Sequence, residues 1–233
     1  MKKDKIPITL LTGFLGAGKT TLLNSVLSDD RYGRVAVIVN EFGETGLDHQ
    51  LIEKSSDDIV LMQSGCLCCS IRGDLPKTIE KLIRKNLQNE INFERIVIET
   101  TGLADPGPIM QTLLLDNVLA ESTRLDGVVT VADAVNGADT LDSQFESVSQ
   151  AALADLIILS KTDIASSQQI LNFKNRLEKI NPTSNIIDAI NWKGVREKIW
   201  GLSALRQKSS YKDVLSWTTG SEPKLIELNN LSG

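Results

Sequence analysis

Eight residues near the amino terminus have the types and the spacing of a phosphate-binding loop. The run Gly13-Phe14-Leu15-Gly16-Ala17-Gly18-Lys19-Thr20 matches the pattern G-x-x-x-x-G-K-[ST] at every fixed position. Its glycines let the backbone approach a polyphosphate closely, so that successive amide groups face the phosphate oxygens. Lys19 is expected to reach the β- and γ-phosphates, and the hydroxyl of Thr20 is expected to bind Mg²⁺. Ala17 and Thr21 complete the predicted nucleotide-binding residues here, and the alternative is a glycine-rich turn with an incidental lysine.

A second cluster, Glu99-Thr100-Thr101-Gly102, comes directly after an apolar run. Glu99 is a candidate to hold a water molecule on Mg²⁺ opposite Thr20, and the amide of Gly102 is a candidate to contact the γ-phosphate and respond to its loss. Together with Lys19, these two residues form the predicted catalytic set. The alternative for Thr101 and Gly102 is an ordinary helix cap and turn.

A third cluster, Ser160-Lys161-Thr162-Asp163, has the pattern with which GTPases recognise their base. The carboxylate of Asp163 would accept two hydrogen bonds from guanine, and the stem of Lys161 would lie along the base. Adenine offers no matching pair of donors, so the pattern favours GTP over ATP. The alternative is that Thr162 or Asp163 only caps the helix that follows.

All three cysteines of the chain lie within four positions, at Cys66, Cys68 and Cys69. This spacing gives no disulfide framework, but thiolates at this density favour Zn²⁺ or a similar transition metal over Mg²⁺. Adjacent cysteines cannot easily both bind one ion unless the backbone turns, so we expect two or three sulfurs in a turn on one ion, with either an outside ligand or the open site of a transfer protein. Glu44 is the first candidate for that ligand, and His49, the only histidine, is the second. Buried packing or a redox pair is the alternative for the cysteines.

Three further acidic residues have less distinctive surroundings. Glu41 is a candidate to bind Mg²⁺ or to position water, and otherwise is an exposed loop charge. Asp105 and Asp133 lie at predicted strand ends, where aspartate usually serves as a turn or cap residue. No glutamine or arginine stands out as the group that orients water or stabilises charge, so we expect slow intrinsic hydrolysis.

The elements that must position these clusters alternate between strands and helices. Apolar runs predict strands at 6–11, 34–39, 59–62, 95–98, 125–132, 156–159 and 186–190, and helical spacing predicts helices at 21–27, 73–87, 106–114, 145–153 and 164–180. This alternation predicts an α/β fold of the P-loop NTPase class, with a mostly parallel central sheet and helices on both faces. Ligands of such sheets lie beyond the carboxyl ends of the strands, so the clusters should converge there.

Composition sets the limits of this prediction. The chain has 233 residues, 41% of them hydrophobic, and a formal net charge of −5. We expect one domain over residues 1–206, including the cysteine loop, and a polar tail over 207–233. The acidic balance argues against a nucleic-acid or membrane partner, and no apolar run approaches the roughly 20 residues of a membrane span. We therefore expect a cytoplasmic protein.

Taken together, the three clusters, the cysteine motif and the run Asn40-Glu41-Phe42-Gly43-Glu44 resemble the CobW-type metallochaperone GTPases, in particular their YjiA-like branch. The resemblance spans most of residues 6–190. It implies a P-loop fold, hydrolysis of GTP with Mg²⁺, and Zn²⁺ or Co²⁺ held by the cysteine motif. Members usually continue into a smaller C-terminal domain, which we expect to be absent here, and often offer a late histidine where this chain has Asn191-Trp192-Lys193.

The resulting hypothesis is a metallochaperone that couples binding and hydrolysis of GTP to the loading and delivery of a metal to a client protein. Two alternatives remain open. One is a metal buffer or sensor in which the nucleotide is a structural lock, and the other is an ATP-using P-loop kinase with a structural zinc. Equal Zn²⁺ affinity in every nucleotide state would favour the buffer, and binding of ATP in preference to GTP would favour the kinase.

Overall fold

The computed structural model of the chain describes residues 4–28, 33–40, 59–61, 67–70, 74–189 and 192–203. Glu41, Glu44, His49, Cys66 and the segment 207–233 lie outside the described residues. The strands are β1 (Ile6–Gly13), β2 (Val35–Asn40), β3 (Ile59–Leu61), β4 (Leu67–Ser70), β5 (Arg95–Thr100), β6 (Thr123–Asp133), β7 (Leu156–Ser160) and β8 (Asn185–Asp188). The helices are α1 (Lys19–Leu27), α2 (Leu75–Leu87), α3 (Gly107–Leu115), α4 (Asn117–Ser122), α5 (Gly137–Ser143), α6 (Phe145–Ala152), α7 (Ser167–Ile180) and α8 (Trp192–Val195).

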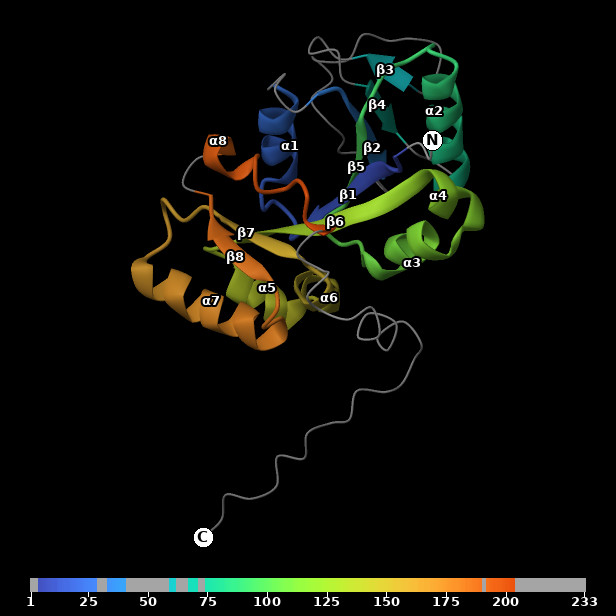
Figure 1. The fold of residues 1–233 in the computed structure, drawn as a ribbon. Helices are drawn as coiled ribbons and strands as arrows, with labels where there is room; N and C mark the ends of the chain where they lie inside the picture. The colour runs from blue at the N-terminus through green and yellow to red at the C-terminus, as the bar shows by residue number, and fades with distance from the viewer. Residues whose placement is uncertain are drawn as a thin grey trace.

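The strands that the structure describes form one eight-stranded sheet in the order β3-β4-β2-β5-β1-β6-β7-β8. From β4 to β8 all neighbouring strands are parallel, and only the pair of β3 and β4 is antiparallel. Helices cover both faces of this sheet, with α1 and α8 on one face and α2 to α7 on the other (Figure 1). The predicted α/β fold with a mostly parallel sheet is confirmed.

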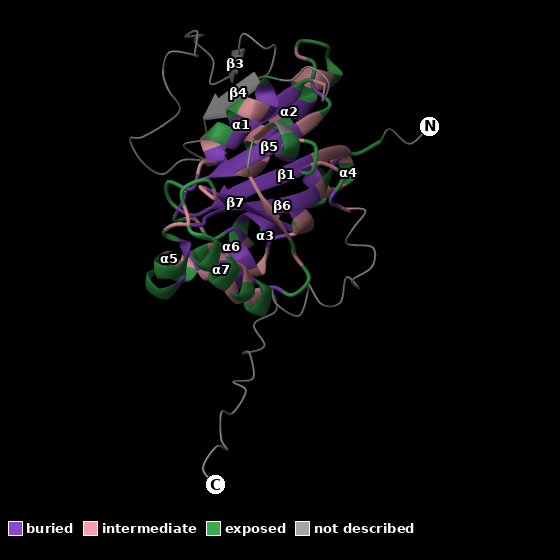
Figure 2. Ribbon diagram, turned by 90° about the vertical axis from the view of Figure 1, so that its left-hand side faces the viewer, coloured by how far each residue is buried: buried purple, intermediate pink, exposed green. Residues whose placement is uncertain are grey.

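The alternation of side chains along the strands divides the core between the two faces. In β5, Ile96 and Ile98 pack with apolar residues of α2 and α3, whereas Val97 packs in the cluster that contains the buried residues of α1. The central strands β1, β5, β6 and β7 are buried along most of their length, while the outer surfaces of the helices are exposed (Figure 2). This is the burial expected of a parallel sheet that is covered on both faces.

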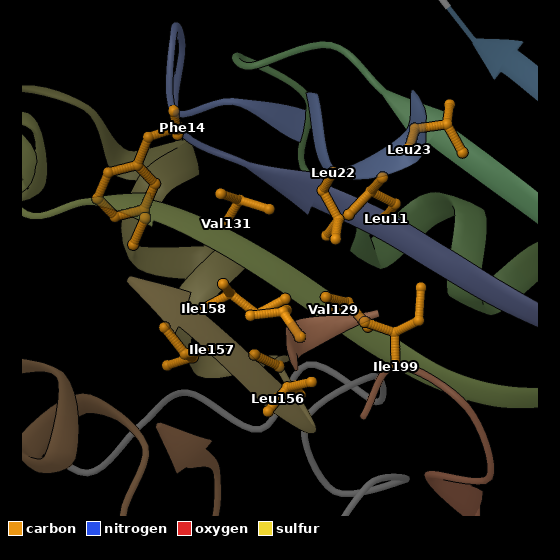
Figure 3. Close-up of a cluster of buried hydrophobic side chains, with 14 of the residues drawn as sticks. Leu11, Phe14, Leu22, Leu23, Val129, Val131, Leu156, Ile157, Ile158 and Ile199 are labelled. Carbon is orange, nitrogen blue, oxygen red and sulfur yellow. The ribbon is translucent and has the colours of Figure 1, made fainter. Parts of the chain in front are cut away.

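The larger core cluster extends to the phosphate-binding run. Leu11, Leu22 and Val131 lie among the side chains that fill it (Figure 3). Phe14, from the run itself, is fully buried and meets Phe173 of α7 edge to face, with ring centroids 6.3 Å apart. Packing of this kind holds the run rigidly on the body of the domain.

Some elements differ from those predicted. The strand β4 was not predicted, and neither were the short helices α4 and α5. The helix expected from 164 begins at Ser167, because the side chain of Ser166 accepts a hydrogen bond from the amide of Gln169 and forms a capping box with it. Among the described residues, no helix is both long enough and apolar enough to cross a lipid bilayer.

Candidate functional site

The carboxyl ends of four central strands bring the predicted clusters to one edge of the sheet. Leu11 pairs in register with Glu99, Gly13 with Val131, and Asp133 with Ser160. The phosphate-binding run follows β1, the Gly102 cluster follows β5, and the Lys161 cluster follows β7. The convergence predicted for these three clusters is confirmed.

The phosphate-binding run, residues 13–20, is built around a close approach of two backbones. Gly13 has a φ of 140°, and a methyl group there would lie 2.2 Å from the carbonyl oxygen of Val131. The next amide, of Phe14, donates to that same oxygen at 3.0 Å. Gly18 has a φ of 98° and caps α1, so a left-handed residue stands where the loop enters the helix. Only glycine fits either position without strain.

Lys19 is held across the mouth of this loop. Its side chain is buried, and its amine donates to the carbonyl oxygens of Gly13 at 3.0 Å and Phe14 at 3.1 Å. A buried ammonium group needs such partners. The lysine is therefore fixed at the amino end of α1, where the helix dipole also favours negative charge.

Thr20 and Glu99 meet between β5 and α1. The hydroxyl of Thr20 donates to Oε1 of Glu99 at 3.0 Å, and Glu99 is buried. A hydroxyl and a carboxylate provide the oxygen ligands that Mg²⁺ prefers. Ala17 is fully buried, and Thr21 is exposed.

Gly102 packs directly against the phosphate-binding run. A methyl group at Gly102 would lie 2.5 Å from the Cα of Leu15, so only glycine allows this approach. The amide of Ala104 donates to the carbonyl of Thr101 at 3.2 Å, which closes a turn around Gly102. Thr101 is not a helix cap, because Pro106 occupies that position of α3.

The Lys161 cluster is held by an aspartate on the neighbouring strand. Lys161 has a φ of 57°, which is unusual for a residue with a side chain, and its amine donates to Oδ2 of Asp133 at 2.6 Å. Asp163 is exposed, and its side chain makes no hydrogen bond with another described residue. Neither Thr162 nor Asp163 caps α7, since Ser166 does.

Asp133 is buried and accepts further hydrogen bonds from the amides of Val135 and Asn136 and from the Asn136 side chain. Burial alone would raise the pKa of this carboxyl, but the hydrogen bonds from Lys161, Asn136 and Val135 outweigh it and hold the pKa below its ordinary value. Asp133 is therefore ionised and fixes Lys161. The interpretation of Asp133 as a simple turn residue missed this contact, whereas Asp105 accepts from the amide of Gly107 as a turn residue does.

The cysteine motif is placed differently from the prediction. Cys68 and Cys69 lie inside β4, where they pair in parallel register with Val37 and Ile38 of β2. The prediction of a backbone turn at these two residues is therefore wrong, because the backbone there is extended and pairs with β2 on one side and β3 on the other. The next residue, Ser70, pairs with Val39, which in turn pairs with Glu99, so the motif approaches the same end of the sheet, separated from β1 by β2 and β5.

Comparison with known proteins agrees with this geometry. A family model described as "CobW/HypB/UreG, nucleotide-binding domain" matches residues 7–188. The zinc chaperone YjiA of Escherichia coli is 44% identical over 178 residues, which are 76% of this chain and 55% of that protein. The zinc-regulated GTPase metalloprotein activator 1 of Schizosaccharomyces pombe is 41% identical over 192 residues, covering 79% of this chain and 46% of that protein.

A solved structure gives the same result for the fold. The Zn(II)-bound YjiA GTPase from Escherichia coli superposes with a TM-score of 0.68 at 41% identity, covering 79% of this chain and 57% of that one. The chain thus spans about half the length of the relatives that it matches. Because the family model covers most of the sequence, the chain belongs to the CobW/HypB/UreG family, whose nucleotide-binding domain it contains.

Proposed function

We propose that this chain is the nucleotide-binding part of a GTP-hydrolysing metallochaperone. The observation that carries the proposal is the contact of Thr20 with Glu99, 3.0 Å long, beside the buried amine of Lys19. It joins a hydroxyl and a carboxylate at the end of the sheet where the amine of Lys19 is also held, next to a loop that only glycine can form. These are the groups with which a P-loop enzyme handles a nucleoside triphosphate and its metal ion.

The phosphates of the nucleotide would lie in the loop formed by residues 13–20, with Ala17 and Thr21 beside them. Lys19 would exchange its two carbonyl partners for phosphate oxygens. Thr20 and Glu99, with Glu41 as a further candidate, would hold Mg²⁺, which when bound neutralises negative charge on the β- and γ-phosphates. The hydrogen bond between Thr20 and Glu99 would fix the two side chains relative to each other, so that their oxygens face the same Mg²⁺ position.

Guanine would be recognised by Asp163, whose carboxylate is exposed and ready to accept two hydrogen bonds. Lys161 would cover the base with its stem, while its amine stays on Asp133. This anchor explains how a long, flexible side chain with a left-handed backbone keeps one orientation. ATP lacks the donors that match Asp163, so GTP would be preferred.

Hydrolysis would involve Lys19, Glu99 and Gly102. The amide of Gly102 would contact the γ-phosphate and lose that partner when the phosphate leaves. We expect slow intrinsic turnover, because the sequence offers no evident group that orients water or supplies a positive charge in the transition state.

The cargo would be Zn²⁺, with Co²⁺ as an alternative, bound by Cys66, Cys68, Cys69 and Glu44. The names of two relatives support this part: one is a zinc chaperone, and the other is a zinc-regulated GTPase metalloprotein activator. A client protein that requires the metal would be the partner. The GTP-bound state would order the loops that complete the metal site, and hydrolysis would release them.

Competition between GTP and ATP for the full chain tests the nucleotide assignment. In Asp163→Ala, GTP affinity should fall about 100-fold while ATP affinity stays unchanged, because only guanine uses this carboxylate. Asp139→Ala, which removes an exposed carboxylate on α5, is the matched control and should change neither affinity. Equal competition by ATP in the unaltered chain would refute the assignment.

A further inference from the structure

Gln150 of α6 reaches from the helix into the turn that contains Gly102. Its side chain is fully buried, and its amide nitrogen donates to the carbonyl of Gly102 at 3.2 Å and to the carbonyl of Ala104 at 2.9 Å. One amide group thus satisfies two carbonyl oxygens of a loop that lies far from it in the sequence. Buried carbonyl groups that lose such a donor are costly, so the contact strongly favours this one conformation of the loop.

The neighbouring residue holds the same loop a second time. The hydroxyl of Ser149 donates to Oδ1 of Asp105 at 2.7 Å, and that oxygen also accepts from the amide of Gly107 at 3.0 Å. Two adjacent residues of α6 therefore fix the loop 101–105 at its middle and at its end.

The helix α6 is itself fixed by contacts with β6 and with Asn181, which follows α7. The backbone carbonyl of Gln150 accepts from the hydroxyl of Thr130 in β6 at 2.7 Å. The buried amide of Asn181 donates to the carbonyls of Ala151, Ala152 and Ala154 at 3.0, 3.0 and 2.9 Å. With α6 bound at its carboxyl end and against the sheet, Gln150 acts from a rigid support.

Gly102 lies between this support and the phosphate-binding run. Its carbonyl is held by Gln150, and its Cα packs against the backbone of Leu15. The direction of the Gly102 amide is therefore limited from both sides. Any shift of the loop toward or away from a γ-phosphate must stretch or break the hydrogen bonds to Gln150.

We infer that Gln150 is a positioning residue that sets the Gly102 amide for the γ-phosphate and so determines how strongly the site distinguishes GTP from GDP. The inference rests on the proposed function, because it takes Gly102 as the group that contacts the γ-phosphate. Ser149 assists by holding Asp105. Neither residue touches the nucleotide, and both act through the backbone of the loop.

The test measures the affinity of the full chain for GTPγS and for GDP, both with Mg²⁺. Gln150→Met keeps the length of the side chain and removes its hydrogen-bond donors. The preference for GTPγS over GDP should fall about tenfold, since two hydrogen bonds of ordinary strength no longer hold the loop. GDP affinity should change little, because GDP has no γ-phosphate for the loop to contact.

Asn86→Ala is the matched control, because it removes a partly buried side-chain amide that donates to the carbonyl of Phe93 at 3.1 Å, ahead of β5 and away from α6 and the loop 101–105. It should lower the melting temperature without changing the preference for GTPγS. Ser149→Ala removes a single partly exposed contact, leaves the core intact and should lower the preference about threefold, which tests the inference even if Gln150→Met fails to fold.

An unchanged preference in Gln150→Met, or in Ser149→Ala where the first variant does not fold, would overturn the inference. An equal loss in Asn86→Ala would also overturn it, because the effect would then be general destabilisation. If the unaltered chain shows the Asp163-dependent choice of GTP over ATP, these results refute only the role of Gln150. If that choice is absent, the proposed function itself fails.

Discussion

Asp133 is the residue on which the geometry of the predicted base-recognition cluster depends. It is buried, it binds the amine of Lys161 at 2.6 Å, and its pKa lies below the ordinary value of 3.8. We expect Asp133→Asn to lower the free energy of unfolding by about 2 kcal/mol at pH 7, because Lys161 loses its charged partner. Urea denaturation of both proteins measures the difference.

The same contact predicts a dependence on pH. A carboxyl whose pKa is lower in the folded state stabilises the fold above its unfolded pKa of about 3.9, and this stabilisation is lost as the pH falls through the folded pKa. The difference between Asp133→Asn and the unaltered chain should therefore shrink below about pH 4. Asp163→Asn, at an exposed position, is the control and should change stability little. A deficit that stays constant between pH 7 and pH 3 would contradict the ion pair.

Gly13 and Gly16 provide a second test, because both have positive φ but different surroundings. A methyl group at Gly13 would lie 2.2 Å from the oxygen of Val131, whereas Gly16 has no atom within 4 Å of that position. Gly13→Ala should cost about 3 kcal/mol of stability, and Gly16→Ala only the left-handed strain of about 1 kcal/mol. Thermal unfolding of the two variants compares them, and equal losses would mean that the close approach to β6 is not needed.

Sequence reasoning found the residues with short, local patterns and missed those defined by distant contacts. The phosphate-binding run, Glu99 and Asp163 are recognisable because their types recur at fixed spacing after apolar runs. Asp133 and Gln150 act on residues 28 and 48 positions away, respectively, and no local pattern marks such partners. The position of Asp133 at the end of β6, which pairs with β7, was the one indication in the sequence that Asp133 contacts the Lys161 cluster.

The start of α7 shows how capping determines an element. The apolar spacing continues back to Ile164, but the helix begins at Ser167 because Ser166 and Gln169 form a capping box. Ser166→Ala should lower the free energy of unfolding by about 1 kcal/mol. Thr162→Ala, four residues earlier, is the control and should have almost no effect on stability. Chemical denaturation measures both variants. A larger loss of stability from Thr162→Ala than from Ser166→Ala would contradict the assignment of Ser166 as the cap of α7.

The buried parallel strands and the two outermost strands, β3 and β8, could be predicted, whereas β4, which lies between β3 and β2, could not. Strands such as β2, β5 and β7 are continuous apolar runs, which is what burial on both faces requires. The strand β4 is short and contains two cysteines, residues that were read as metal ligands in a turn. In its pairing with β2, Cys68 lies opposite Val37, 31 residues earlier, and in its pairing with β3, Cys69 lies opposite Ile59, 10 residues earlier. The local spacing of residues therefore gave no indication that β4 is a strand.

The molecule as a whole places its chemistry along one edge of a single sheet. The phosphate-binding run and the base-recognition cluster follow central strands, and β4, with Cys68 and Cys69, is separated from β1 by β2 and β5. The proposed coupling would run along this end of the sheet, where β2 and β5 lie between the two proposed sites. We therefore propose that the coupling depends on this end of the sheet rather than on one residue.

Titration of Zn²⁺ into the full chain, with Mg²⁺ and either GTPγS or GDP, measures this coupling. The affinity for Zn²⁺ should be higher with GTPγS; a thousandfold difference would correspond to about 4 kcal/mol, comparable to gaining one good ligand. A variant with Cys66→Ser, Cys68→Ser and Cys69→Ser should keep nucleotide binding and lose Zn²⁺ binding. Equal Zn²⁺ affinity in the two nucleotide states, or undiminished Zn²⁺ uptake by the triple variant, would contradict the proposed metallochaperone.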